Sequence, residues 1–158
     1  MTPLPDKTQK IYLKPGELFW GNSNNRIDTI LGSCVAVCLW HPIKKVGGMC
    51  HIVLPGKRNT KRDILNPKYG DDAITLILNH IQEEKTFPKE YITKIFGGGN
   101  IITNSKLPNM QIGRLNIEKT IKRLADNNFD ITVNHTGGDI SRKITFDLWN
   151  GEVWLKKI

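Results

Sequence analysis

The sequence has 158 residues, of which 39% are hydrophobic and 24% are charged, so it fits one folded domain and excludes a disordered chain. The formal net charge of +8 indicates a surface that attracts anionic partners. The N-terminal segment has no apolar stretch of signal-peptide length, and the longest apolar run, residues 30–40, is too short to span a bilayer. We therefore expect one soluble, cytoplasmic domain over residues 1–158.

The first third of the chain is predicted to consist mainly of strands. Residues 10–21 form a strand that a Pro-Gly turn interrupts, and residues 22–25 form a loop. Residues 31–40 and 45–55 predict two more strands, because both runs are short, rich in β-branched and apolar residues, and punctuated by glycine. These two strands are expected to pair as a hairpin around residues 41–44.

Two segments have the hydrophobic periodicity of amphipathic helices. The first begins at residues 70–72, Gly-Asp-Asp, where an aspartate at the N-cap would accept the free amides of the first turn. Its apolar residues recur at helical spacing, and they are Ala73, Ile74, Ile77, Leu78 and Ile81. The second helix is predicted over residues 116–127, with an apolar face formed by Ile117, Ile121 and Leu124.

Further strands follow each predicted helix. Residues 91–96 predict a buried strand that ends in three glycines, and residues 130–135 predict another that ends in Thr-Gly-Gly. Residues 142–158 predict a hairpin in which Asn150-Gly151 forms a two-residue type I′ turn. Runs of strands with two helices indicate an α/β (α+β) fold of layered mixed β-sheets with the helices packed outside.

Three cysteines and a histidine in the predicted hairpin raise the question of a metal site. Cys34, Cys38, Cys50 and His51 all belong to the residue types that bind zinc. Residues four apart on a strand are separated by about 13 Å, so one ion cannot reach both Cys34 and Cys38. Cys50 and His51 are adjacent and point to opposite faces. The sequence therefore predicts no metal and no cofactor.

The same hairpin favours a cysteine nucleophile. A loop at residues 41–44 places Cys34 directly opposite His51, and opposed Cβ atoms in an antiparallel pair lie about 4.5–5.5 Å apart. A nearby imidazolium favours the thiolate, which is the nucleophilic form of cysteine. The alternative is that all three cysteines are buried packing residues, which is the ordinary role of a cysteine. We expect that role for Cys38 and Cys50.

Six segments in order resemble one bacterial family. They are LGSCVAVCLWHP (31–42), KVGGMCHIVLP (45–55), KYGDDAI (68–74), IFGGGN (95–100), IGRLNI (112–117) and HTGGDISRKITFD (135–147). This ordered set resembles the chemoreceptor glutamine deamidases, the CheD family of bacterial chemotaxis, over nearly the whole chain. The resemblance implies a single deamidase domain whose fold is similar to cysteine hydrolases of the cytotoxic necrotizing factor type.

The resemblance also implies an activity and a set of catalytic residues. It implies a protein-glutamine glutaminase that converts glutamine side chains of methyl-accepting chemotaxis receptors to glutamate, and some members also hydrolyse receptor glutamate methyl esters. Cys34 matches the family nucleophile and His51 matches the base. The third position, six residues before the cysteine, is usually threonine in the family, but here it is Asp28, with Thr29 beside it. Either residue is therefore the candidate that orients His51.

Four further residues are candidates for binding the substrate. Ser33 precedes the nucleophile, where the glycine-serine entry lets nearby amides stabilise an oxyanion. Gly98 lies in the predicted tight turn after residues 91–96, and Thr136 and Gly137 lie in the loop that the resemblance places near the site.

The expected partners follow from the resemblance and from the charge. Chemotaxis receptors are the expected protein substrate, and the positive surface suits electrostatic steering toward acidic receptor helices. The alternative function is a binding regulator of a CheC-type phosphatase with little or no catalysis. Nucleic-acid binding is not expected, because the sequence has no recognition helix, no aromatic-basic interleaving and no zinc motif. We expect a monomer without membrane insertion.

Overall fold

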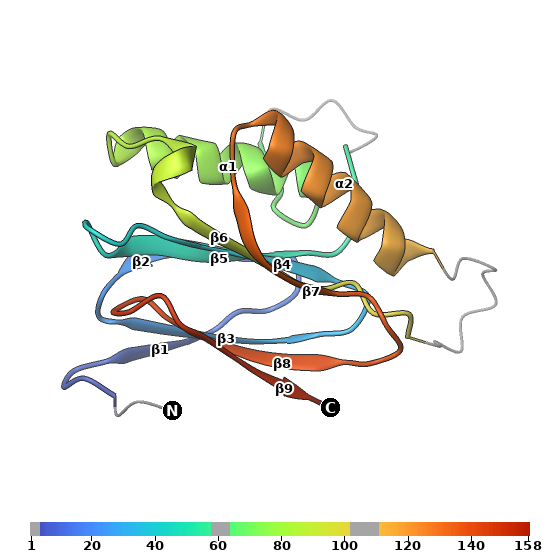
Figure 1. Ribbon diagram of the computed structural model, residues 1–158, viewed down its shortest axis with the longest axis horizontal. Coiled ribbons are helices and arrows are strands. Elements are labelled where there is room, and N and C mark those ends of the chain that lie inside the picture. The colour runs from blue at the N-terminus through green and yellow to red at the C-terminus, as the bar shows by residue number, and fades with distance from the viewer. Residues whose placement is uncertain (1–3, 58–63, 102–110) are drawn as a thin grey trace.

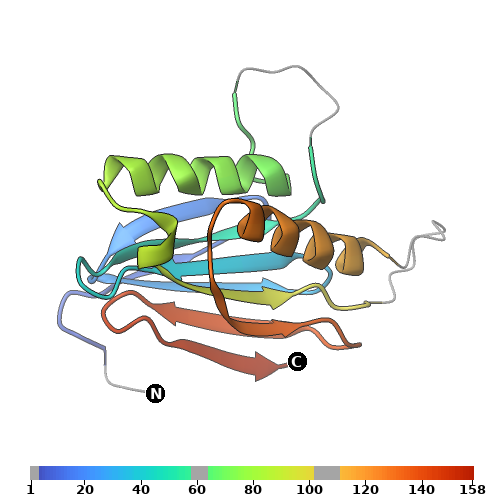
Figure 2. The same cartoon turned by 45° about the horizontal axis from the view of Figure 1, so that its top comes forward.

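The computed structural model describes residues 4–57, 64–101 and 111–158, which form three layers. Two helices, α1 (Gly70–Glu83) and α2 (Ile112–Asp126), cover one face of a five-stranded sheet. A four-stranded sheet packs against the other face of that sheet (Figure 1). Figure 2 shows the same order of layers from a second direction. The predicted α+β class, with layered sheets and helices outside them, is confirmed.

Both sheets mix parallel and antiparallel pairs. The five-stranded sheet has the order β2-β5-β4-β6-β7, and its strands are β2 (Leu18–Asn22), β4 (Val35–Trp40), β5 (Val46–Ile52), β6 (Ile92–Gly97) and β7 (Ile131–Thr136). The four-stranded sheet has the order β1-β3-β8-β9, and its strands are β1 (Gln9–Tyr12), β3 (Asn25–Leu31), β8 (Arg142–Asp147) and β9 (Val153–Lys157). The parallel pairs are β1 with β3 and β6 with β7. A short 3₁₀ helix, Pro88–Glu90, precedes β6.

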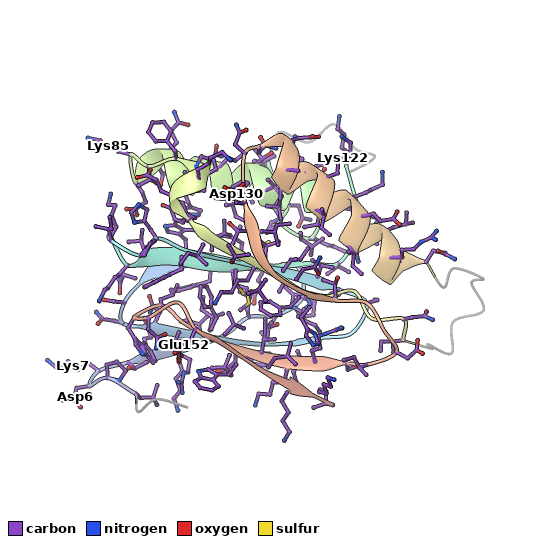
Figure 3. All side chains as sticks on the ribbon, in the orientation of Figure 1. Asp6, Lys7, Lys85, Lys122, Asp130 and Glu152 are labelled. Atoms are coloured by element: carbon purple, nitrogen blue, oxygen red, sulfur yellow. The ribbon has the colours of Figure 1, made fainter. Side chains whose placement is uncertain are left out.

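Two apolar cores hold the layers together, one on each face of the five-stranded sheet. Because successive residues of a strand point to opposite faces, β4 sends Val37 and Leu39 toward the helices and Ala36 and Cys38 toward the second sheet. This two-sided burial explains why the strand reads as a continuous apolar run. Figure 3 shows side chains filling the space between the layers. Cys38 and Cys50 are both buried, and they belong to different cores, as their expected packing role requires.

The sequence predicts no strand over residues 25–31, yet β3 pairs with both β1 and β8. Its inward residues Ile27 and Leu31 are buried between the sheets, while the outward Arg26 forms an ion pair with Asp147 at 2.6 Å. Thr29 on the inner face and Ile30 on the outer face break the apolar alternation that would have indicated a strand. β3 matters here because it carries both Asp28 and Thr29.

Three predicted details are wrong: one helix cap, one helix start and one turn type. The N-cap of α1 is Tyr69, which makes no side-chain cap, so the two aspartates lie in the first turn, where they still favour the helix dipole. The helix α2 begins at Ile112, four residues before the predicted start, so its first turn contains Gly113. The hairpin of β8 and β9 has a four-residue loop in which only Gly151 has a positive φ, of 76°, so the type I′ turn is wrong.

Candidate active site

His51 lies on the face of β5 that packs against the four-stranded sheet. The predicted pairing with Cys34 is wrong, because Ala36 is the residue directly opposite His51. The loop between β4 and β5 covers residues 42–45, one residue later than predicted, and this moves every pair by two positions. A shift of two keeps each side chain on its face.

Cys34 is therefore the diagonal neighbour of His51. It lies immediately before β4, is half-buried, and packs against the core between the two sheets. Diagonal neighbours on one face of an antiparallel pair have Cα atoms about 7–8 Å apart, within reach of an imidazole ring. The thiol and the ring thus share one face at the same end of the hairpin.

A hydrogen bond from the opposite sheet fixes the His51 ring. Its Nδ1 lies 2.8 Å from Oγ1 of Thr29, and that hydroxyl also lies 2.8 Å from the carbonyl oxygen of Leu13. A carbonyl oxygen only accepts, so the single hydroxyl proton of Thr29 goes to Leu13. Nδ1 of His51 must then carry a proton and donate to Thr29. The other nitrogen, Nε2, is left unprotonated and able to accept a proton.

The two candidates for the third position point in opposite directions from β3. Thr29 is fully buried between the sheets and contacts the ring. Asp28 faces away from the core, and its carboxylate accepts a hydrogen bond from the hydroxyl of Thr145 on β8. The contact with His51 therefore belongs to Thr29, and Asp28 contributes to the outer face of the four-stranded sheet.

Burial disfavours charge on both candidate catalytic groups. It raises the pKa of the Cys34 thiol and lowers the pKa of His51 to about 4, with a smaller opposing effect from Glu17. His51 is only 1% exposed, which is consistent with this cause. At neutral pH both shifts favour a neutral thiol beside a neutral imidazole. The sequence had suggested a thiolate beside an imidazolium, and these directions do not favour that state.

The three consecutive glycines hold the segment before β4 in place. The backbone N–H of Gly98 donates to the carbonyl of Cys34, and that of Gly99 donates to the carbonyl of Gly32, both at 2.8 Å. Gly97 has a φ of 103°, and a Cβ there would lie 2.2 Å from the carbonyl oxygen of Cys34. The glycines are therefore required for close approach of two backbones.

The backbone carbonyls around Cys34 accept hydrogen bonds, but two backbone amides at the same place do not donate any. Within the ranges that the structure describes, the backbone N–H groups of Ser33 and Cys34 donate no hydrogen bond. Such amides can bind the negative oxygen of a tetrahedral intermediate. Cys34 is also more exposed than the buried His51 and Thr29, so it is the most accessible of the three side chains.

Comparison with known proteins assigns the chain to a family. Residues 53–157 match the family described as CheD chemotactic sensory transduction. The probable chemoreceptor glutamine deamidase CheD 3 of Dechloromonas aromatica (strain RCB) is 41% identical over 155 residues, covering 98% of this chain and 91% of the relative. The chain belongs to the CheD family. Similar values hold for a probable chemoreceptor glutamine deamidase CheD of Pseudomonas fluorescens (strain SBW25), at 38% identity with 96% and 86% covered.

A more distant bacterial relative supports the same assignment. The probable chemoreceptor glutamine deamidase CheD 1 of Leptospira interrogans (serovar Lai, strain 56601) is 37% identical, with 97% of this chain and 95% of the relative covered. The family match begins after His51, whereas these pairwise similarities extend over nearly the whole chain. The predicted resemblance to the CheD family is confirmed.

The remaining candidates of this CheD-family chain lie around the end of β6. Thr136 pairs with Gly97, and the N–H of Gly137 donates to the carbonyl of Gly97 at 2.9 Å. The structure thus brings the loop at 136–137 beside the glycine segment that contacts Cys34. Arg142, which the sequence did not single out, fixes this loop, because its buried guanidinium donates to the carbonyls of Gly97 and Gly137.

Neither a metal-binding group nor a membrane-spanning helix is found among the described residues. Within residues 4–57, 64–101 and 111–158, no group of three His, Cys, Asp or Glu side chains is placed to hold a metal ion. No helix in those ranges is long and apolar enough to cross a membrane. Two surface hollows lie beside the helices, and neither is lined by Cys34 or His51.

Proposed function

We propose that this CheD-family chain is a chemoreceptor glutamine deamidase that hydrolyses glutamine side chains of chemotaxis receptors to glutamate and ammonia. The names of its relatives support the reaction and the substrate. The observation that carries the proposal is the contact of Thr29 with Nδ1 of His51, because it leaves Nε2 as a proton acceptor on the face shared with Cys34.

The first half of the proposed reaction forms a thioester. Sγ of Cys34 attacks the carboxamide carbon while Nε2 of His51 takes the thiol proton, and the amides of Ser33 and Cys34 donate to the oxyanion. Because burial disfavours both separate charges, we expect proton transfer to accompany the attack rather than to precede it. The imidazolium then protonates the leaving nitrogen, the C–N bond breaks, and ammonia departs.

The second half consumes water. Nε2 of His51 removes a proton from a water molecule as its oxygen attacks the thioester carbon, and the C–S bond breaks. The imidazolium returns the proton to Sγ of Cys34, so the products are a glutamate side chain and the free thiol. Thr29 accepts from Nδ1 of His51 throughout, which keeps the ring in one tautomer. Gly98, Thr136 and Gly137 are proposed to contact the chain that flanks the substrate glutamine.

The proposal is tested by mass spectrometry of a receptor cytoplasmic fragment incubated with the protein. Each converted glutamine gains about 1 Da, because NH₂ is replaced by OH through the thioester. Cys34→Ala is expected to abolish the gain. Cys38→Ala is the matched control, because Cys38 is a buried cysteine of the same strand region outside the site. Unchanged conversion by Cys34→Ala would show that Cys34 is not the nucleophile.

Binding of a CheC-type phosphatase and the monomeric state stay predictions. A binding role does not require the thiol, so Cys34→Ala should stimulate such a phosphatase as well as the parent protein does. Loss of stimulation in Cys34→Ala would link that binding to the reaction site.

A further inference from the structure

The side chain of Asn116 connects the two segments that carry the proposed nucleophile and base. Asn116 lies on α2 and is 0% exposed. Its Nδ2 lies 3.0 Å from the carbonyl oxygen of Ser33 and 3.1 Å from the carbonyl oxygen of Val53. The amide nitrogen carries two protons, so both bonds can form at once.

Each of these two carbonyls flanks a proposed catalytic residue. Ser33 immediately precedes Cys34, and Val53 follows His51 by two positions, just beyond the end of β5. Ser33 and Val53 lie outside the paired residues of the β4–β5 ladder, whose last pair joins Val35 with Ile52. The amide of Asn116 therefore bridges the hairpin at the position where its own backbone pairing stops.

The other end of the Asn116 amide shows that this bridge has a cost. Its Oδ1 is buried and has no hydrogen-bond partner among the described residues. An unsatisfied buried acceptor is destabilising, but an apolar side chain of similar size would leave the carbonyls of Ser33 and Val53 without this donor. What the position supplies is therefore two donors to the backbone of the site, while Oδ1 stays unsatisfied.

Close packing of α2 on the glycine segment lets so short a side chain reach the hairpin. A Cβ on Gly113 would lie 2.6 Å from the carbonyl oxygen of Gly99 and 2.7 Å from that of Gly98. A Cβ on Gly98 would lie 2.3 Å from Cγ1 of Ile117. Helix and glycine segment thus meet backbone to backbone, directly beside the residue that makes the bridge.

We infer that Asn116 is a positioning residue of the deamidase, which holds Cys34 and His51 in reacting geometry through the carbonyls of Ser33 and Val53. This inference rests on the proposed function. The hydrogen bonds of Asn116 go to backbone carbonyls and to neither the thiol nor the ring. Its effect on the reaction must therefore pass through proton transfer between Cys34 and His51. Removing the two donors should loosen that cooperation and leave the overall fold in place.

The test is a double-mutant cycle read by the rate at which iodoacetamide alkylates Cys34 at neutral pH. The variants are Asn116→Leu, His51→Ala and the combination of both. General-base assistance is typically worth about 100-fold or more, so we expect Asn116→Leu to slow alkylation by roughly 10-fold in the parent background. In the His51→Ala background the same change should alter the rate by less than about twofold, because no cooperation remains to be lost.

Controls separate positioning from general damage. Thr120→Val is the matched control, because Thr120 lies one turn further along the same buried face of α2 and is 2% exposed. It should leave the alkylation rate within about twofold of the parent. Circular dichroism and thermal unfolding check that each variant folds, and Asn116→Ser replaces Asn116→Leu in the cycle if the latter does not.

Three results would overturn the inference. The first is an equal slowing by the Asn116 change with and without His51, which would mark a merely structural residue. The second is an equal slowing by Thr120→Val. The third is an alkylation rate in the Asn116 variant that matches the parent. Alkylation needs no receptor, so failure of receptor deamidation would overturn the proposed function while the cycle would still report on Asn116.

Discussion

Lowering the pH is expected to destabilise the fold through His51. The pKa of His51 is about 4 in the folded protein, whereas an unfolded histidine has a pKa near 6.5. Between these values the unfolded chain binds a proton that the folded chain does not. The stabilisation is therefore fully present above about pH 6.5 and is lost as the pH falls toward 4. A difference of roughly 2.5 units corresponds to about 3 kcal/mol at 1.36 kcal/mol per unit.

Urea unfolding at several pH values between 7.5 and 4.5 measures this effect. The parent protein should lose free energy of unfolding over that range, and His51→Gln should lose about 2–3 kcal/mol less, since glutamine does not titrate. The comparison is between the changes of the free energy of unfolding with pH, so a constant difference in stability between the two proteins does not affect it. Parallel loss of stability in the parent and in His51→Gln would show that His51 is not held neutral by burial.

The same pKa shifts set the expected pH profile of deamidation. His51 must be neutral to accept a proton, so the acidic limb of kcat/KM should fall near pH 4 rather than near 6.5. Burial raises the pKa of Cys34, so the basic limb should lie above the usual thiol range. A preformed thiolate-imidazolium pair would assign the acidic limb to the thiol and the basic limb to the imidazolium. An acidic limb at pH 6 or above would refute a pKa of about 4 for His51.

Two further sets of substitutions test the residues that hold His51 and Cys34 in place. Thr29→Val keeps the shape of the side chain but leaves Nδ1–H of His51 without an acceptor, and we expect a stability loss of about 1–3 kcal/mol and at least 10-fold slower deamidation, with partial rescue by Thr29→Ser. Equal rates for Thr29→Val and the parent would contradict the assigned tautomer. Gly137→Ala should lower the free energy of unfolding by about 1–2 kcal/mol, because alanine is disfavoured at its positive φ. Gly97→Ala should lower it by more, because the added Cβ would also clash with the carbonyl of Cys34. Equal losses by urea unfolding would exclude that clash as the reason for the glycine.

Local chemistry in the sequence was enough to predict most of the elements. The apolar runs at 31–40 and 45–55 and the helical spacing from Ala73 to Ile81 indicated structure correctly, because their burial pattern follows the backbone period. The shared face of Cys34 and His51 also followed from strand alternation. β3 was missed because half of its residues are polar and satisfied by partners on neighbouring strands, such as the ion pair of Arg26 with Asp147.

The residues that complete the site could not be found from local sequence. Thr29 and His51 meet only because two sheets stack, and nothing in the spacing of Asp28 and Thr29 shows which of them faces inward until β3 is known to be a strand with Ile27 buried. Asn116 had no signal beyond its place in a polar helix, since its function depends on the distance between α2 and the hairpin. Contacts between layers are set by tertiary packing, which periodicity does not encode.

The predicted register was wrong, yet Cys34 and His51 still lie on one face of the hairpin, and the period of a strand is the physical reason. The loop between β4 and β5 lies one position later than predicted, so each partner moves by two, and two is the period of a strand. An even shift exchanges the direct neighbour for the diagonal one but preserves the face, so Cys34 and His51 remain together. A loop one residue longer or shorter would instead have moved pairs by one and turned His51 toward the helical core, on the same face as Val37. Predicting which faces meet in a hairpin therefore requires the parity of its register, and predicting reaction geometry requires the full register together with the bridges, such as Asn116, that hold its open end.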